Sequence, residues 1–231
     1  MTDASQFDPR DYPVVDAAEG YGEWAADYES TVAVGLDRPL LERLASVSWA
    51  EVGAAADLAC GTGRTAEWLR ARGVGAIDGV DITPQMQEQA RAKNVYRSLT
   101  IADVASTGLA AAAYDLVIMA LACEHLAELA PVYGEAARLL RPGGQFAIVG
   151  YHPFFLLNGK MTHYHRGDGE AVAIRSYVHL FDEHVAAGNA AALRLDEMRE
   201  CVIDEAWLTS KPKWRPYLHW PVSYGMVWRK N

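Results

Sequence analysis

The stretch Ala54-Ala55-Ala56-Asp57-Leu58-Ala59-Cys60-Gly61-Thr62-Gly63 decides the fold. It begins with a short, mainly apolar run over 54–59, and a helical pattern through Trp68 and Leu69 follows the loop. Alanine has a low strand propensity, so we infer the strand from this context rather than from its composition. Small residues in the loop allow a ligand to approach the backbone closely, and glycine permits the turn that such a loop needs. The stretch predicts a strand, a ligand-binding loop and a helix.

Downstream of this unit, strands and helices alternate. Further strands are expected over 74–80, 96–101, 114–121 and 145–151, and helices are expected from Pro84 through Ala90 and over 124–140. The run over 114–121 is continuously apolar, which is typical of a parallel strand buried on both faces. Thr83-Pro84 supplies an N-cap and a proline at the first helical position. Such alternation predicts a parallel sheet with right-handed crossovers.

The chain beyond Tyr151 has a different pattern. Residues 153–169 look irregular and rich in aromatic and histidine side chains, and 171–187 look helical. Two final strands are expected over 194–203 and 222–228, with no full helical crossover between them. Such a connection favours an antiparallel pair at the sheet edge.

These patterns predict one domain over residues 1–231. The expected fold is α/β: a Rossmann-like, mostly parallel seven-stranded sheet with an antiparallel edge strand and helices on both faces. The helical pattern over 1–48 predicts an N-terminal cap over the ligand site. The stretches 152–192 and 204–221 are expected to form inserts around a substrate pocket.

Composition excludes several classes of function. Hydrophobic residues make up 51% of the chain, which is enough for a packed core, and the formal net charge is −9. That charge argues against nucleic acid and against an anionic membrane as partners. The three cysteines are far apart, as in a protein with reduced thiols, and the polar N-terminus does not resemble a secretory signal. We therefore expect a cytoplasmic protein, either a monomer or a homodimer.

Three carboxylates lie at the carboxyl ends of three successive strands of the predicted sheet. Asp57 lies in the first strand near its end, Asp81 ends the second and Asp103 closes the third. In open α/β folds, ligands bind outside the carboxyl ends of the strands, and an acid about 20 residues after the glycine loop binds ribose hydroxyls. The acids and the glycine loop therefore predict a nucleoside site.

The loop alone leaves the nucleoside open, because residues 61–66 also fit the Ala-ended form of the dinucleotide fingerprint. Three other features argue against a dinucleotide as the ligand. About fifty residues of helical pattern precede the first strand, and no tyrosine is followed four residues later by lysine, the pair of a short-chain dehydrogenase. Pro142-Gly143-Gly144 before the fifth strand, with the trailing strand pair, belongs to a different family.

The sequence resembles the class I S-adenosylmethionine-dependent methyltransferases, especially the ubiquinone/menaquinone and malonyl-carrier-protein methyltransferase-like group. The resemblance rests on the order and spacing of motifs at 21–28 (YGEWAADY), 57–63 (DLACGTG), 79–84 (GVDITP), 102–104 (ADV), 114–117 (YDLV), 124–126 (EHL) and 140–144 (LRPGG). One departure is Ala59, which stands where the family usually has its first glycine. Alanine fits there if its φ stays negative.

The resemblance implies S-adenosyl-L-methionine as cofactor and a role for each matching residue. Asp57 would orient the amino end of the methionine moiety through water, and the backbone of Ala59, Cys60, Gly61 and Gly63 would line that moiety. The adenosine would be held by Asp81 at the ribose, Ile82 and Val104 at the adenine ring, and Asp103 at the adenine amino group. Ala120 and Leu121 would lie under the sulfonium.

The aromatic residues near the N-terminus have two interpretations. Tyr21 and Tyr28 would cover the sulfonium as an aromatic lid, because a cation over an aromatic ring is stabilised. Alternatively, the stripe that they form with Trp24 only packs a helix on the body of the domain. For Trp24, packing is the favoured interpretation.

The implied reaction is in-line displacement at the sulfonium methyl, with a small organic molecule as acceptor. A base is needed only where the nucleophile arrives protonated. His125, after the fourth strand, is the first candidate and His152 the second, although a hydrogen-bonded residue at a helix start is the favoured interpretation of His125. His163, His165, His179 and His184 could bind a metal, but no spacing fixes a third ligand and the reaction needs none, so no metal site is predicted.

The same four histidines are expected to help wall a substrate pocket, in keeping with the aromatic lining of many ligand sites. They would do so together with Tyr151, Phe154, Tyr164, Trp214, Tyr217, His219 and Trp220. Lys211, Lys213 and Arg215 could meet an anionic group of the acceptor or form a solvated positive loop.

Two other functions remain open. An NAD(P)-dependent oxidoreductase would share the crevice and Asp81. A non-catalytic cofactor-binding subunit would share the fold, but would be expected to lack some of the acids, all of which are present here. An enzyme that binds S-adenosylmethionine without methylating is a related possibility, because the fold does not fix the chemistry.

Overall fold

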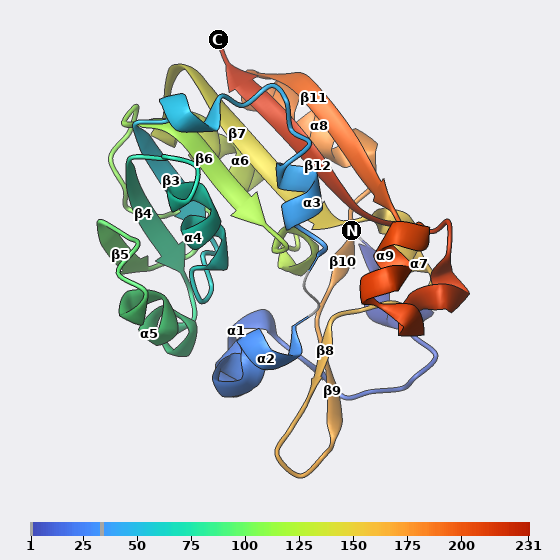
Figure 1. The fold of residues 1–231 in the computed structure, drawn as a ribbon. Coiled ribbons are helices and arrows are strands. Elements are labelled where there is room, and N and C mark those ends of the chain that lie inside the picture. The colour runs from blue at the N-terminus through green and yellow to red at the C-terminus, as the bar shows by residue number, and fades with distance from the viewer. Residues whose placement is uncertain (1, 33–34) are drawn as a thin grey trace.

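The computed structural model describes residues 2–32 and 35–231 and is built around a seven-stranded sheet with the order β11-β12-β7-β6-β3-β4-β5 (Figure 1). Its strands are β3 (Ala54–Leu58), β4 (Ala76–Asp81), β5 (Ser98–Ile101), β6 (Tyr114–Ala120), β7 (Leu140–Tyr151), β11 (Leu193–Val202) and β12 (Pro221–Lys230). β3 to β7 run parallel, and β12 pairs antiparallel with both β7 and β11. The predicted mostly parallel sheet with an antiparallel pair at its edge is confirmed.

The strand order reverses next to β3. From β3 the chain builds β4 and then β5 toward one edge, and it returns to the other side of β3 for β6 and β7. Ligands of open α/β sheets bind at such a switch point, outside the carboxyl ends of the strands. The sequence that follows β3 is the glycine loop.

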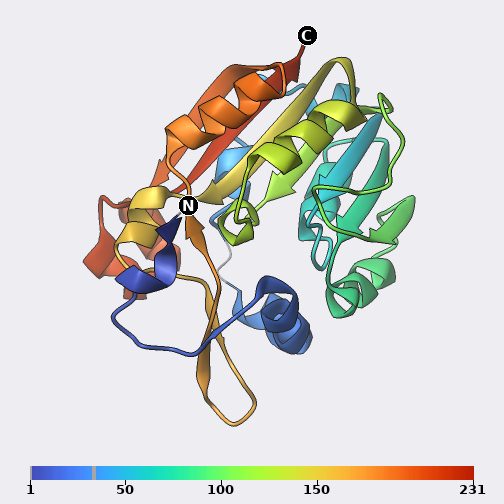
Figure 2. The same ribbon diagram turned by 180° about the vertical axis from the view of Figure 1, so that it is seen from behind.

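Helices cover both faces of the sheet, as Figures 1 and 2 show from opposite sides. α3 (Arg38–Leu41) and α4 (Arg64–Arg70) cover one face, and α6 (Ala130–Leu139) and α8 (Phe181–Ala190) cover the other. The strands alternate accordingly: Val117 of β6 joins the cluster under α6, whereas Ile118 joins the cluster under α4. α5 (Pro84–Ala92) packs on β4 and β5.

The N-terminal segment lies beyond the carboxyl ends of the strands, next to a β-hairpin (Figure 1). It comprises β1 (Thr2–Asp3), η1 (Ala4–Phe7), β2 (Val14–Val15), α1 (Ala17–Trp24), η2 (Ala25–Asp27) and α2 (Tyr28–Thr31). The hairpin consists of β8 (His163–His165) and β9 (Ala171–Ile174), and β9 also pairs parallel with β2. β1 pairs with β10 (Tyr177–Val178). The N-terminal segment is therefore interwoven with residues 163–178.

The prediction of a helix over 171–187 is wrong in its first half. Residues 171–178 form β9 and β10, and the helix begins only at Phe181. The cause is pairing with β2 and β1, more than 150 residues away in the chain, which overrides the local pattern.

The helix expected over 124–140 is also shorter than predicted. A 3-10 turn, η4 (Cys123–His125), comes first, and α6 starts at Ala130 with a proline in its first turn. The insert after Tyr151 is more regular than expected, with α7 (Pro153–Leu157) before β8. The segment before β12 contains α9 (Glu205–Ser210) and η5 (Pro212–Tyr217), and η3 (Trp49–Glu51) precedes β3.

In the part of the chain that the structure describes, no helix is both long and apolar enough to cross a membrane.

Candidate nucleoside site at the carboxyl ends of the strands

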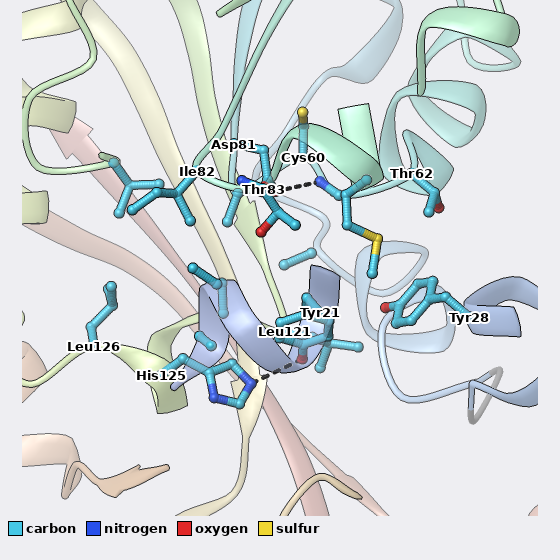
Figure 3. Close-up of a pocket in the computed structure, with 18 of the residues that line it drawn as sticks. Tyr21, Tyr28, Cys60, Thr62, Asp81, Ile82, Thr83, Leu121, His125 and Leu126 are labelled. Carbon is cyan, nitrogen blue, oxygen red and sulfur yellow. Dashed lines mark hydrogen bonds between the residues drawn. The ribbon is translucent and has the colours of Figure 1, made fainter. Parts of the chain in front are cut away.

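A cavity of about 380 Å³ lies where β3, β4 and β6 end, beside α1 and α2 (Figure 3). The cofactor residues predicted from the sequence all line it, except Asp57 and Gly63. Those that line it are Tyr21, Tyr28, Ala59, Cys60, Gly61, Asp81, Ile82, Asp103, Val104, Ala120 and Leu121. The candidate base His125 lines it too, whereas His152 does not. The fold thus brings together residues that are as far as 104 positions apart, such as Tyr21 and His125.

Asp81 is the best-positioned acid of the site. Its Oδ2 accepts the backbone N–H of Gly61 at 2.7 Å, and its Oδ1 accepts the backbone N–H of Thr83 at 2.8 Å. Burial raises the pKa of this carboxyl, and the backbone donors oppose the rise. A carboxylate has about four lone-pair positions, so each oxygen can still accept one more proton donor. The Thr83 side chain makes no capping hydrogen bond, so the N-cap bond expected from Thr83 is not observed.

The glycine loop turns through three residues with positive φ. These are Ala59 at 52°, Gly61 at 52° and Gly63 at 85°. The expectation that Ala59 keeps a negative φ is therefore wrong, and this alanine adopts the left-handed conformation that glycine occupies without strain. The loop is held by hydrogen bonds from Cys60 N to Val80 O at 3.0 Å and from Gly63 N to Cys60 O at 2.9 Å.

Asp57 and Gly63 lie behind the loop rather than in the cavity. Asp57 is 1% exposed and its Oδ2 accepts the hydroxyl of Tyr96 at 2.7 Å. Burial raises the pKa of Asp57 to about 7, and the bond from Tyr96 opposes the rise. A Cβ at Gly63 would come within 3.0 Å of the Tyr96 ring. Neither residue lines the cavity, so the lining role that the resemblance implied for the Gly63 backbone does not match this geometry.

Asp103 and Val104 lie beyond the end of β5 and line the cavity on that side. Asp103 Oδ1 accepts the backbone N–H of Ala105 at 2.7 Å, which fixes the carboxylate but leaves its second oxygen available. Ile82 is 50% exposed although it is a large apolar residue, and it lines the same side. An exposed apolar side chain beside a fixed carboxylate is suited to a flat ring with a polar edge.

His125 is held in one tautomer by two hydrogen bonds. Its Nδ1 lies 2.7 Å from the carbonyl oxygen of Arg175, and its Nε2 lies 2.9 Å from the hydroxyl of Tyr21 (Figure 3). A carbonyl only accepts, so we assign the proton to Nδ1, which leaves Nε2 as the acceptor. Burial lowers the pKa of His125 to about 4. The imidazole at the cavity wall is therefore neutral at physiological pH.

The three aromatic residues of the N-terminal stripe, Tyr21, Trp24 and Tyr28, have different surroundings. Tyr21 and Tyr28 line the cavity and meet edge to face at 6.0 Å. Trp24 does not line it and stacks instead on Tyr21 at 6.0 Å and on Tyr164 of β8 at 5.8 Å. The packing interpretation of Trp24 agrees with this geometry.

Two of the other candidate histidines, His152 and His184, are engaged in structural contacts. His152 Nδ1 accepts the N–H of Phe154 and caps α7, and its Nε2 lies 2.8 Å from Glu200 Oε1. His184 is fully buried between the hydroxyls of Tyr133 and Tyr224. Over residues 2–32 and 35–231, no three His, Cys, Asp or Glu side chains gather as metal ligands would.

The aromatic residues expected to wall a substrate pocket pack on one another instead. Phe155 stacks on Trp214 at 5.7 Å and meets Tyr217 and Trp220 edge to face. None of the residues named for that wall lines the cavity. The half of the cavity away from the glycine loop is lined by Asp16, Ala17, Ala18, Ala122, Leu126, Arg175 and Tyr177.

Several lining residues were missed by the sequence analysis for different reasons. Thr62, Arg64 and Thr65 belong to the loop and the first turn of α4, so their place in the motif was a usable signal. Arg175 and Tyr177 reach the cavity only because β9 and β10 pair with the N-terminal strands. No local pattern in the sequence reveals that pairing.

Fold and site together define a class: a Rossmann-like α/β domain with a nucleoside-sized cavity at its switch point. Residues 56–148 match the family model described as a methyltransferase domain. Within residues 56–148 the chain therefore resembles methyltransferase domains, as its motifs predicted.

Some known proteins resemble the chain in sequence, and others resemble it in fold. The demethylmenaquinone methyltransferase of Thermus thermophilus is 34% identical over 102 residues, which cover 42% of this chain and 46% of that protein. The chain thus spans about half the length of the relative it matches. The S-adenosylmethionine-dependent methyltransferase from Mesorhizobium loti has a TM-score of 0.62 at 18% identity, covering 93% of this chain and 100% of that one. The [4+2]-cyclase SpnF has a TM-score of 0.67 at 14% identity, covering 95% and 98%. These two likenesses concern the fold.

The conformation of Ala59 generates a stability prediction. Relieving a left-handed alanine gains about 1–2 kcal/mol, and the greater chain entropy of glycine costs about 0.5–1 kcal/mol. We expect Ala59→Gly to raise the free energy of unfolding by about 0.5–1 kcal/mol in urea denaturation. The control Ala56→Gly, in buried β3, should lower it by about 1 kcal/mol or more. Equal destabilisation by both variants would contradict the strain at Ala59.

The tautomer of His125 generates a spectroscopic prediction. Long-range proton–nitrogen NMR spectra should show the proton on Nδ1 and no titration of this ring until the pH falls to about 4. Because the folded pKa lies below that of the unfolded chain, stability from this group is complete above the unfolded pKa and decreases as the pH falls toward 4. A ring that titrates like an exposed histidine, or that carries its proton on Nε2, would refute the assignment.

Proposed function

We propose that the chain binds S-adenosylmethionine in the cavity and transfers its methyl group to a small organic molecule. The observation that carries the proposal is the carboxylate of Asp81, fixed by Gly61 and Thr83 at the cavity wall with one free acceptor position on each oxygen. Two adjacent ribose hydroxyls are the donors that such a carboxylate suits.

The other lining residues fit the remaining parts of the cofactor. Ile82 would pack on adenine, and Asp103 would accept from the adenine amino group, with the backbone of Val104 next to it. Ala120 and Leu121, where β6 ends, would lie under the sulfonium, and Tyr21 and Tyr28 would cover it. The volume of about 380 Å³ is in the range of ligand pockets.

When bound, S-adenosylmethionine supplies a methyl group that is already activated for in-line displacement. The task of the protein is therefore alignment of the acceptor and exclusion of water. Residues 17–31 of the N-terminal segment, within one domain with the sheet, serve as the cover, whereas α3 packs on a face of the sheet. Glu29 of α2 attaches the cover to the glycine loop through a hydrogen bond from Thr62 at 2.6 Å and to α5 through Lys93 at 2.5 Å.

His125 is the base of this proposal where the acceptor arrives protonated. Its Nε2 faces the cavity with its lone pair directed at the Tyr21 hydroxyl, and the ring stays neutral down to a pH of about 4. A neutral imidazole with its Nδ1–H fixed by a carbonyl is the form that accepts a proton. His152 is left out because both of its ring nitrogens are engaged away from the cavity.

The acceptor half of the cavity favours a compact molecule. Ala17, Ala18 and Leu126 supply apolar surface there, and Arg175 is neutralised by Asp16 at 2.8 Å and Asp3 at 3.2 Å. With a net charge of −9, the protein favours small molecules over nucleic acid as acceptors. Folds of this kind also host chemistry other than methylation, so the test measures the cofactor and the transfer separately.

The function generates a binding prediction at Asp81. Isothermal titration should show micromolar binding of S-adenosylhomocysteine and no binding of NADH or NADPH. Asp81→Ala should weaken S-adenosylhomocysteine binding by about tenfold or more, because a charge-assisted pair of hydrogen bonds is lost. Asp182→Ala, at an exposed carboxylate of α8, is the matched control and should leave the affinity unchanged.

Circular dichroism of the variants separates loss of binding from loss of fold. An unchanged affinity in a folded Asp81→Ala protein, or binding of NADH in place of S-adenosylhomocysteine, would contradict the proposal. Transfer of a labelled methyl group to members of an acceptor library then tests methylation itself. Cofactor binding without any transfer would place the chain among non-methylating enzymes or cofactor-binding subunits.

A further inference from the structure

Two buried side chains of opposite charge line the cavity next to the glycine loop without satisfying each other. Arg64 is the first residue of α4, directly after Gly63, and Asp37 precedes the first turn of α3. Arg64 Nη2 and Asp37 Oδ2 are 3.8 Å apart, and the two side chains are 12% and 6% exposed. Among residues 2–32 and 35–231, neither Arg64 Nη2 nor Asp37 Oδ1 has a hydrogen-bond partner.

Such an arrangement is costly for the protein alone. A separation of 3.8 Å is too long for a hydrogen bond, so the pair is an ion pair without the bonds that usually stabilise buried charges. A buried charged group without a hydrogen-bond partner carries the full cost of its lost hydration. A ligand that carries both an anionic and a cationic group next to each other would satisfy both side chains at once.

The surroundings add donors for an anion. Tyr28 lines the cavity, and burial raises the pKa of its phenol to about 12 while Arg64 opposes the rise, so the hydroxyl keeps its proton. Lys211 is also close to the pair: burial and Lys213 lower the pKa of its amine, Asp37 acts in the opposite direction, and its Nζ has no hydrogen-bond partner in the described residues. Arg64 and the Tyr28 hydroxyl therefore line the cavity as donors beside the Asp37 carboxylate, whereas Lys211 lies outside the lining, over the rings of Trp207 and Trp214.

The position of Arg64 and Asp37 along the cavity also suits the end of an elongated ligand. Ile82 and Asp103 follow β4 and β5, toward one edge of the sheet. Asp37 belongs to the segment whose Leu36 carbonyl accepts the Ser223 hydroxyl of β12, toward the other edge. Asp81 lies between the two ends, at the glycine loop. An elongated ligand with its ribose at Asp81 and its adenine at Ile82 would direct its remaining end toward Arg64.

We propose that Arg64 and Asp37 form the subsite for the α-amino acid end of the cofactor, with Arg64 binding the carboxylate and Asp37 the ammonium group. The proposal rests on the proposed function, because it takes a nucleoside cofactor with an amino acid tail as the ligand. It assigns to this pair the role that the sequence motif suggested for Asp57. The subsite makes the protein selective for ligands that carry a complete amino acid.

The test compares three ligands by isothermal titration. S-Adenosylhomocysteine carries the whole amino acid, its decarboxylated analogue carries only the amine, and 5′-methylthioadenosine carries neither. Wild-type protein should bind S-adenosylhomocysteine at least about tenfold more tightly than 5′-methylthioadenosine, as a charge-assisted pair predicts.

Arg64→Met should weaken S-adenosylhomocysteine about 10- to 100-fold, the range of hydrogen bonds to charged groups. It should leave 5′-methylthioadenosine within about twofold, because that ligand has no carboxylate for Arg64 to bind. Asp37→Asn should weaken both ligands that carry the amine, again without affecting 5′-methylthioadenosine. Arg91→Met, at an exposed arginine of α5, is the matched control and should change none of the three affinities.

The outcomes separate this inference from the function on which it rests. If wild-type protein binds none of the three ligands, the proposed function fails. If it binds S-adenosylhomocysteine and 5′-methylthioadenosine equally well, or if Arg64→Met weakens both by the same factor, the subsite is overturned and the cofactor stands. Arg64→Lys, which keeps the charge without the planar fork, gives the same comparison if the methionine variant does not fold, with a smaller loss of selectivity expected.

Discussion

The carboxylate of Asp81 is the group on which the site depends. It ends β4 and accepts the backbone N–H groups of Gly61 and Thr83, so it joins the loop after β3 to the turn that starts α5. Burial makes the charged form costly, and the two donors compensate for that cost. The same bonds that fix the loop also direct the remaining lone pairs of Asp81 into the cavity. Asp81 therefore both holds the loop in place and offers acceptors to a ligand.

The opposite wall depends on contacts between distant segments. His125 accepts from Tyr21 of α1 and donates to the carbonyl of Arg175, and thereby joins the N-terminal cover, the end of β6 and the segment between β9 and β10. Arg175 in turn binds Asp3 and Asp16. The acceptor half of the cavity therefore forms only when the N-terminal segment and residues 171–178 are both in place, whereas the cofactor half belongs to the parallel sheet.

This division explains how much the sequence could predict. The parallel sheet, its strand ends and most residues of the cofactor half followed from apolar periodicity and from motifs of adjacent residues. The left-handed Ala59 was not predictable, because alanine rarely adopts that conformation and only the hydrogen-bonded loop imposes it. β9 and β10 were mistaken for helix, and the aromatic residues near Trp214 for a pocket wall, because long-range pairing and mutual stacking leave no local pattern.

The most direct test of the central claim is a crystal structure of the protein with S-adenosylhomocysteine. The account predicts adenosine at the carboxyl ends of β3, β4 and β5, with both ribose hydroxyls donating to Asp81 and the adenine against Ile82. A nucleoside bound elsewhere, or bound in this cavity with its ribose away from Asp81, would contradict the account.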